Sequence, residues 1–398
     1  MPLKYVKTPP TEVAFTGTAP ALRGGASFTP DADDVASRLS PADVEQIAEI
    51  FHTPLNGAYV WNYDEADKRI RKLYRLGKER NWNADYDVDW ERFYPHSSSP
   101  MIEGGENPYA DWDSFAKLSP EQQTEFGWHQ HAWTMSQFLH GEQGALLVSS
   151  QLVSCAPTYD AKLYASSQTF DEARHVEVFG RYLHEHVRIV YPINRHLKAL
   201  MDKILTDERW DLKFIGMQLI IESLALAAFH VQQAMAADPL LRDIIGLVVR
   251  DEARHVAFGV NYMEQFVKAL PQNEIEDRAQ FAFEACRVMR ERIVPTDVFE
   301  HYGFDVEEGR RRFLAAGQMD MFRNLLFTRI MPNLQRVGLL TESVKPRFQE
   351  LGLLEFAALP SDADIDWASL EAPLPVVSRA PAASDIREIT PLRKTSAA

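Results

Sequence analysis

A six-residue sequence occurs twice in this chain of 398 residues, and it constrains the fold more than any other feature. The sequence DEARHV stands at residues 171–176 and again, 80 residues later, at 251–256. A chance repeat of six identical positions is very improbable, so the copies indicate an internal duplication. A further glutamate precedes the Glu of each copy by 30 residues, Glu142 in the first half and Glu222 in the second. Each half therefore supplies one upstream Glu and one E-x-x-H motif.

The E-x-x-H spacing places a carboxylate and an imidazole on one side of a helix, because positions i and i+3 are neighbours there. This holds for Glu172 with His175 and for Glu252 with His255. The separation of 30 residues fits a helical hairpin that returns each upstream Glu to the level of its E-x-x-H. Four antiparallel helices would then gather four carboxylates and two imidazoles on the axis of one bundle.

Four carboxylates in such apolar helices need positive charge close by, because an unpaired buried charge is costly. Two divalent cations would balance them, which predicts a dinuclear metal site. Carboxylate and imidazole donors without thiolate suit iron or manganese better than calcium, magnesium or structural zinc. Cys155 and Cys286, the only cysteines, form no C-x-x-C pair, which excludes a thiolate zinc site. We expect two Fe ions, with Mn/Fe as the alternative.

Apolar periodicity predicts helices along most of the chain, whereas strand-type alternation is scarce. The Ser119-Pro120-Glu121-Gln122 sequence predicts a capped helix that runs to about Val153. Further helices are expected at roughly 158–190, 207–236, 239–269, 273–301 and 306–336, and shorter ones at 40–51 and 64–80. The predicted fold class is all-α, a ferritin-like four-helix bundle with additional N- and C-terminal helices.

This pattern divides the chain into four parts. They are an N-terminal extension with short helices and loops (1–118), the four-helix bundle (119–270), C-terminal accessory helices (271–358) and a flexible tail (359–398). The tail is rich in Pro, Ala, Ser and Asp, a composition typical of segments without a packed core.

Composition excludes several classes of function. Lys and Arg number 42 against 57 Asp and Glu, and the net charge of −15 disfavours binding to nucleic acid. Neither a G-x-G-x-x-G nor a P-loop sequence occurs, so a bound nucleotide has no support. No signal peptide and no long uninterrupted apolar run is evident, and we expect a cytoplasmic protein that contacts no membrane.

Both D-E-x-R-H motifs resemble those of ferritin-like di-iron carboxylate proteins. They are similar to the motifs of bacterial multicomponent monooxygenase hydroxylase α subunits, and more distantly to those of arylamine N-oxygenases and acyl-carrier-protein desaturases. The resemblance covers about residues 119–270. It implies two iron sites, one made by Glu142, Glu172 and His175, the other by Glu222, Glu252 and His255. The four glutamates would act in catalysis through these metals.

The same resemblance implies an outer layer of side chains around the ligands. Asp171 and Asp251 match carboxylates that orient the ligand histidines, since an imidazole with one metallated nitrogen presents an N–H at the other. Arg174 and Arg254 can close this layer through ion pairs.

Apolar residues one or two helical turns from the ligands suggest a pocket for an apolar or aromatic organic substrate. The expected lining is Leu146, Phe179, Gln218, Leu226 and Phe229. The predicted function is a non-haem di-iron oxygenase that activates O2 to hydroxylate, N-oxygenate or desaturate this substrate. Val248 stands where arylamine N-oxygenases carry an additional His, which weakens N-oxygenation.

Two other functions use the same ligands. An iron-oxidising and iron-handling protein needs only about four helices, fewer than this chain supplies. A radical-generating partner subunit is disfavoured because Phe179 stands where ribonucleotide reductase small subunits usually place the radical Tyr. No flavin, haem or iron–sulfur motif is present, so an oxygenase would need an external electron donor, a reductase or ferredoxin. Superfamily analogy suggests a homodimer.

Overall fold

The computed structural model of the protein describes residues 51–364, apart from 93, 102–106 and 316. Contacts divide the chain into two units, Met1–His52 and Thr53–Ala398, and the elements below belong to the second. The predicted helix at 40–51 falls almost wholly outside the described residues, and so does the predicted tail from residue 365 onward.

The described residues form helices and no β-strand. In chain order the helices are α2 (Lys68–Glu79), α3 (Asp113–Ala116), α4 (Pro120–Cys155), α5 (Tyr159–Arg181), η2 (Tyr182–Val187), α6 (Arg195–Thr206), α7 (Trp210–Lys213), η3 (Phe214–Ile221), α8 (Glu222–Met235), α9 (Pro239–Lys268), α10 (Gln272–Glu291), α11 (Thr296–His301), α12 (Val306–Ala315), α13 (Gly317–Val337), α14 (Lys345–Glu350), η4 (Leu354–Ala358) and η5 (Asp362–Asp364). The segments η2 and η3 are π-helical.

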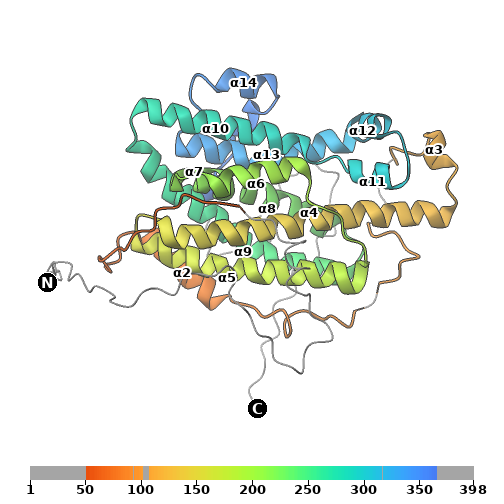
Figure 1. The fold of residues 1–398 in the computed structure, drawn as a ribbon, viewed down its shortest axis with the longest axis horizontal. Helices are drawn as coiled ribbons and strands as arrows, with labels where there is room; N and C mark the ends of the chain where they lie inside the picture. Colours follow the sequence, from red (N-terminus) through yellow and green to blue (C-terminus); the bar gives the residue numbers. More distant parts are fainter. Residues whose placement is uncertain (1–50, 93, 102–106, 316, 365–398) are drawn as a thin grey trace, which may run out of the picture. The chain divides into compact units, whose positions relative to one another are not determined.

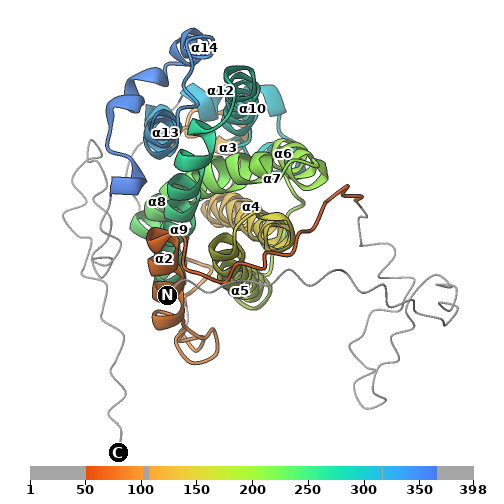
Figure 2. The ribbon, with the colours of Figure 1, turned by 90° about the vertical axis from the view of Figure 1, so that its left-hand side faces the viewer.

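Two helical hairpins make the central bundle. The first joins α4 to α5, and the second joins α8 to α9, with α7 and η3 leading continuously into α8. Contacts of α5 with α9 and of α4 with η3 hold the hairpins together. Figure 1 shows these helices from the side, and Figure 2 shows them end-on with α2 outside α5 and α9. The all-α, ferritin-like prediction is confirmed.

The start of α4 shows how the local sequence sets a helix boundary. Ser119 Oγ accepts the N–H of Gln122 at 3.3 Å, and Gln122 Oε1 accepts the N–H of Ser119 at 2.9 Å. Pro120 follows as the first helical residue, where its missing N–H costs nothing. The predicted capping box is therefore present, and the helix runs to Cys155, close to the predicted end.

Outside the bundle the boundaries differ more from prediction. The helix expected at 273–301 is two helices, because Pro295 cannot continue α10 and the next helix begins after it at Thr296. Helix α6 was not predicted, although Asn194 caps it through the N–H of His196 at 2.9 Å. Ser361 and Asp362, assigned to the tail, are buried and hydrogen-bonded to Asn333.

The stretch Trp210–Met235 is long and apolar enough to cross a membrane by composition alone. In the structure, 89% of its most apolar window is buried inside the protein. Its place in the bundle core accounts for its hydropathy.

Candidate metal centre

The bundle brings the six predicted ligands together in its interior, each at most 5% exposed. Their donor atoms form two groups, and within each group all lie within 4.8 Å of one another. One group contains Glu142, Glu172, His175 and Glu252, and the other contains Glu172, Glu222, Glu252 and His255. Glu172 and Glu252 belong to both groups and can each bridge two metals, whereas the sequence assigned each to a single iron.

Glu222 owes its position to the π-helix that precedes it. Its backbone N–H bonds to the carbonyl of Met217, five residues back, so η3 is wider than an α-helix up to this point. Every side chain from Phe214 to Ile221 is buried, and Glu222 is the first carboxylate after this apolar turn. A π-helical segment next to a functional residue is a common arrangement, because it rotates the following side chains relative to a regular helix.

Each ligand histidine faces carboxylates through Nδ1. His175 Nδ1 lies 3.0 Å from Glu252, 3.1 Å from Glu142 and 3.3 Å from Glu172. His255 Nδ1 lies 3.2 Å from Glu172 and 3.5 Å from Glu252. Donors this close together match the interior of a metal coordination sphere, where one ion replaces several hydrogen bonds.

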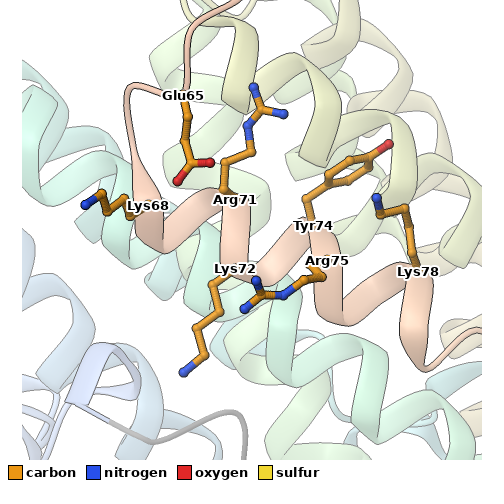
Figure 3. A pocket seen from close by; sticks show the side chains of 7 residues that line it. All are labelled: Glu65, Lys68, Arg71, Lys72, Tyr74, Arg75 and Lys78. Atoms are coloured by element: carbon orange, nitrogen blue, oxygen red, sulfur yellow. The ribbon is translucent and has the colours of Figure 1, made fainter.

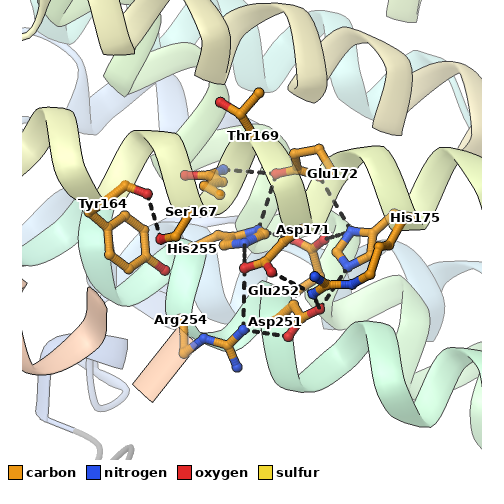
Figure 4. A network of polar contacts seen from close by, with 12 residues as sticks. Tyr164, Ser167, Thr169, Asp171, Glu172, His175, Asp251, Glu252, Arg254 and His255 are labelled. Atoms are coloured by element: carbon orange, nitrogen blue, oxygen red, sulfur yellow. Dashed lines mark hydrogen bonds and ion pairs between the residues drawn. The ribbon is translucent and has the colours of Figure 1, made fainter. Parts of the chain in front are cut away.

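The opposite nitrogen of each imidazole contacts the aspartate of the other repeat. His175 Nε2 lies 3.2 Å from Asp251, and His255 Nε2 lies 3.2 Å from Asp171 (Figure 4). Both aspartates therefore fix ring orientation, as the resemblance implied, but they do so across the bundle between α5 and α9.

Two arginines complete this layer. Arg174 Nη2 donates to Asp171 at 2.5 Å and to Asp251 at 3.0 Å. Arg254 Nη2 donates to Asp171 at 3.3 Å and also pairs with Asp251. All four side chains are at most 5% exposed, so the two positive charges offset the two buried carboxylates.

Two residues that the sequence did not single out as supports also hold this network. Trp82, which follows α2, donates its indole N–H to Asp251 at 2.7 Å and stacks on His175. Gln168 donates its amide to Glu172 at 2.9 Å and to Glu222 at 3.0 Å, joining carboxylates from both halves. Gln168 lies one turn before Glu172, a signal that spacing provides, whereas nothing in the sequence around Trp82 points to the metal centre.

Unsatisfied polar atoms show that the site fits metal ions. Glu172 Oε2, both carboxylate oxygens of Glu252 and His255 Nδ1 are buried without a hydrogen-bond partner. Unpartnered buried polar atoms are rare in proteins, and here they are the atoms that face the centre of the ligand set. The structure therefore holds a dinuclear metal site built from carboxylate and imidazole groups.

The pKa shifts of the ligands reflect the same excess of negative charge. Burial, together with the nearby Glu252, raises the pKa of both Glu142 and Glu222 well above the ordinary value. Burial acts the same way on Glu172, but His255 and His175 outweigh it and hold the pKa of Glu172 below its usual range. Burial lowers imidazole pKa values, yet the surrounding carboxylates raise those of His175 and His255 well above normal. Protons thus take the place of cationic charge.

The residues predicted to line the pocket are mostly packing residues. Phe179 and Phe229 are fully buried and stacked, with ring centroids 5.6 Å apart, and Leu226 is equally buried. Gln218 is buried with both amide atoms unpartnered, and Leu146 is half-buried. None of these five lines the cavity that reaches the metal ligands.

That cavity lies between α4, the η3–α8 junction and the end of α10. Its lining is Gln137, Phe138, Gly141, Glu142, Ala145, Ile221, Glu222, Ala225 and Arg292. It touches Glu142 and Glu222, the two glutamates that each belong to one ligand group only. The sequence gave no signal for Arg292, which lies outside the bundle.

Solved structures to which the chain is similar include an R2-like ligand-binding oxidase with an aerobically reconstituted metal cofactor after photoconversion. The identity is 18%, the TM-score is 0.44, and the match covers 70% of this chain and 95% of that one. A variant of the same oxidase with an anaerobically reconstituted Mn/Fe cofactor also matches, at 18% identity and a TM-score of 0.43, over 70% and 95% of the two chains. None of the curated protein sequences compared with the chain matches it.

A family match covers more than half of the chain. Residues 63–338 match the family described as p-aminobenzoate N-oxygenase AurF. Among the resemblances noted from the motifs, arylamine N-oxygenases were the more distant, and the absence of their additional His at Val248 weakened that choice. The longer match outweighs this single position, so the chain belongs to the AurF family and is an O2-dependent dimetal oxidoreductase.

Proposed function

We propose that the protein N-oxygenates an aromatic amine at a di-iron centre, with Mn/Fe as the alternative metal pair. The observation that carries this proposal is the cavity that joins the two outer ligands, Glu142 and Glu222, to an otherwise apolar lining. Phe138, Ala145 and Ile221 are buried and offer an aromatic ring a water-poor surface. The family match supports the choice of amine oxidation over hydroxylation or desaturation.

Two ferrous ions in this site would supply both electrons needed to reduce O2. One oxygen atom goes to the amine nitrogen to give a hydroxylamine, and the other leaves as water with two protons. The chain contributes positioning and exclusion of water. Gln168 and the aspartate–arginine layer hold ligand carboxylates and imidazoles in place, while the apolar lining keeps bulk water from the reacting nitrogen.

The first test is metal loading followed by oxygen reaction. Purified apo-protein is loaded with Fe(II) under nitrogen, metals per chain are counted, and O2 is added with an aromatic amine such as 4-aminobenzoate. We expect two irons per chain and a hydroxylamine product identified by mass spectrometry. A site that oxidises its iron, keeps accepting further Fe(II) and leaves the amine unchanged would contradict the proposal and indicate iron handling.

We also propose that an external, acidic electron donor docks on α2. A surface groove there is lined by Glu65, Lys68, Arg71, Lys72, Tyr74, Arg75 and Lys78 (Figure 3). Lys68, Arg75 and Lys78 are exposed, in a chain whose net charge of −15 would otherwise repel an acidic partner. The opposite side of α2, with Ile70 and Leu73, packs against the helices that carry the two repeats.

Salt dependence tests this docking site. We expect reduction of the metal-loaded protein by an acidic ferredoxin to slow as ionic strength rises, and to slow about tenfold further in a Lys68→Glu, Lys78→Glu variant. Lys345→Glu on α14 makes the same kind of charge reversal elsewhere and serves as the control. Equal rates in the groove variant and the control would exclude this surface. The homodimer and the cytoplasmic location stay predictions.

A further inference from the structure

Arg292 is a buried cation without a counter-charge beside the metal centre. It follows the last residue of α10, is 8% exposed, and lines the cavity that touches Glu142 and Glu222. Among the described residues, no carboxylate forms an ion pair with its guanidinium and no acceptor forms a hydrogen bond with it. Every other charged side chain in the outer layer of the metal centre is paired, so Arg292 is the exception that needs an explanation.

Desolvation of this guanidinium is costly, and its surroundings return little. Burial alone lowers the pKa of Arg292 to about 10, and no neighbouring carboxylate acts in the opposite direction. The side chain is still charged at neutral pH. Its place at the C-terminal end of α10 offers only the partial negative charge of the helix terminus. A buried, charged, unpartnered guanidinium is the usual mark of a site that waits for an anion.

The other polar residue in the lining cannot supply that anion. Gln137 donates its amide to the carbonyl of Pro192 at 2.9 Å, and its oxygen accepts the N–H of Asn194 at 2.6 Å. The remaining lining away from Glu142 and Glu222 is apolar. The cavity thus pairs metal ligands from the bundle with one cation from an accessory helix.

The geometry points to Arg292 as the residue that binds a carboxylate of the substrate and thereby selects aromatic amines that are also acids. This inference rests on the proposed function for the amine and adds the charged group at the other side of the ring. A single guanidinium balances one negative charge, and its planar fork matches a carboxylate in bidentate fashion. A phosphate would bring more charge than the lining offsets. The acid would face α10 while the amine faces the bundle.

The cavity must widen to admit such a ligand. Its volume of about 20 Å³ has room for about one water molecule. Phe138 borders it and packs edge-on against Phe229, with ring centroids 4.6 Å apart. We expect Phe138 to change rotamer when an aromatic acid binds.

Binding of two uncharged or charged isosteres tests the role of Arg292 without any turnover. Benzoate and benzamide are titrated calorimetrically into the metal-loaded protein. We expect benzoate to bind at least tenfold more tightly than benzamide. Arg292→Gln should weaken benzoate about 10- to 100-fold and leave benzamide within about twofold, and Arg292→Lys should restore part of the loss.

Arg287→Gln is the matched control, because it removes the same charge from an exposed position on the same helix. Equal binding of both ligands by the native protein, or a preference for benzoate that survives in Arg292→Gln, would overturn the inference; the second result would show that the metals bind the acid. If Arg292→Gln does not fold, the native protein and Arg292→Lys still decide.

Product analysis separates this inference from the proposed function. The native protein is supplied with 4-aminobenzoate and with 4-aminobenzamide. Oxidation of the acid in clear preference to the amide supports both proposals. Oxidation of both at similar rates supports N-oxygenation and contradicts the role of Arg292. If neither amine is oxidised, the function fails, while the binding experiment still decides what Arg292 does.

Discussion

The indole N–H of Trp82 and the imidazole Nε2 of His175 meet on one oxygen, Oδ2 of Asp251, at 2.7 and 3.2 Å. Asp171, the matching aspartate of the first repeat, receives no indole N–H among the described contacts. A residue from outside the repeats thus supports one half of the metal centre and not the other.

Replacement of Trp82 by Phe should therefore affect the two metal positions unequally. The ring still packs on His175, but Asp251 loses a buried hydrogen bond, and support of this kind typically changes metal affinity by about 10- to 100-fold. We expect the metal next to His175 to be released first when a chelator is titrated into the variant. Crystals soaked at intermediate chelator concentration would report occupancy at each position, and equal loss at both would contradict the expectation.

Gln168 should matter more to the metal-free protein than to the loaded one. Its amide bonds to Glu172 and Glu222, which metal ions would otherwise neutralise. Gln168→Leu leaves those buried oxygens unpartnered and should lower the free energy of unfolding of the apo-protein by about 1–3 kcal/mol. Denaturant unfolding with and without bound Fe(II) measures the difference.

Thr169→Val is a suitable control for that experiment, because Thr169 lies next in the sequence and bonds only to the carbonyl of Ala165. A loss of stability in Gln168→Leu that is the same in apo- and metal-loaded protein would show that the amide supports the fold and not the ligands.

A buried histidine predicts how stability depends on pH. Burial lowers the pKa of His131 to about 4, against about 6.5 in the unfolded chain. The folded state therefore keeps His131 neutral, and the unfolded state gains a proton first as the pH falls. This contribution is fully present above pH 6.5 and declines by about 3 kcal/mol as the pH falls to 4.

The metal-loaded His131→Gln variant isolates this contribution. Relative to the native protein its free energy of unfolding should rise as the pH falls from 6.5 to 4, because the titrating group is gone. Parallel stability curves over that range would mean that His131 is protonated in the folded protein, despite its single polar contact, Tyr182 at 3.1 Å.

Close helix packing makes one glycine much less replaceable than another. A Cβ at Gly259 would lie 2.5 Å from Cβ of Gln218 and 3.2 Å from its backbone, neither of which can move aside freely. Gly259→Ala should cost about 3 kcal/mol or more. Gly141→Ala meets nothing within 4 Å and should instead stabilise α4 by about 0.5–1 kcal/mol. Thermal unfolding of both variants checks the sign and the order.

The metal centre was more predictable than its surroundings for a physical reason. Glu172 and His175 are three residues apart on one helix, so local geometry alone places them together, and the duplication repeats that geometry around Glu252. Trp82 and Arg292 act on the centre from positions 169 and 40 residues away from their nearest repeat partners, Asp251 and Glu252. Their placement depends on how α2 and α10 pack on the bundle, which no periodic pattern records.

The pocket shows the same limit. Phe179 and Phe229 lie on the predicted helix faces near the ligands, yet they fill the core. Which apolar residues border a cavity depends on small shifts between helices, and here the π-helical turn before Glu222 rotates that helix relative to a regular one. The sequence also missed the break at Pro295 that ends α10 near Arg292.

The crossed contacts of the aspartates and histidines have the pattern of an isologous interface, in which residue i meets residue j and j meets i. Two separate copies of one hairpin, related by a twofold axis, would make the same contacts. The chain thus encloses a pseudo-symmetric dimer, and neither half can assemble a metal site without the other. Fusion of the halves leaves each free to diverge, one toward the support from Trp82 and the other toward the cavity.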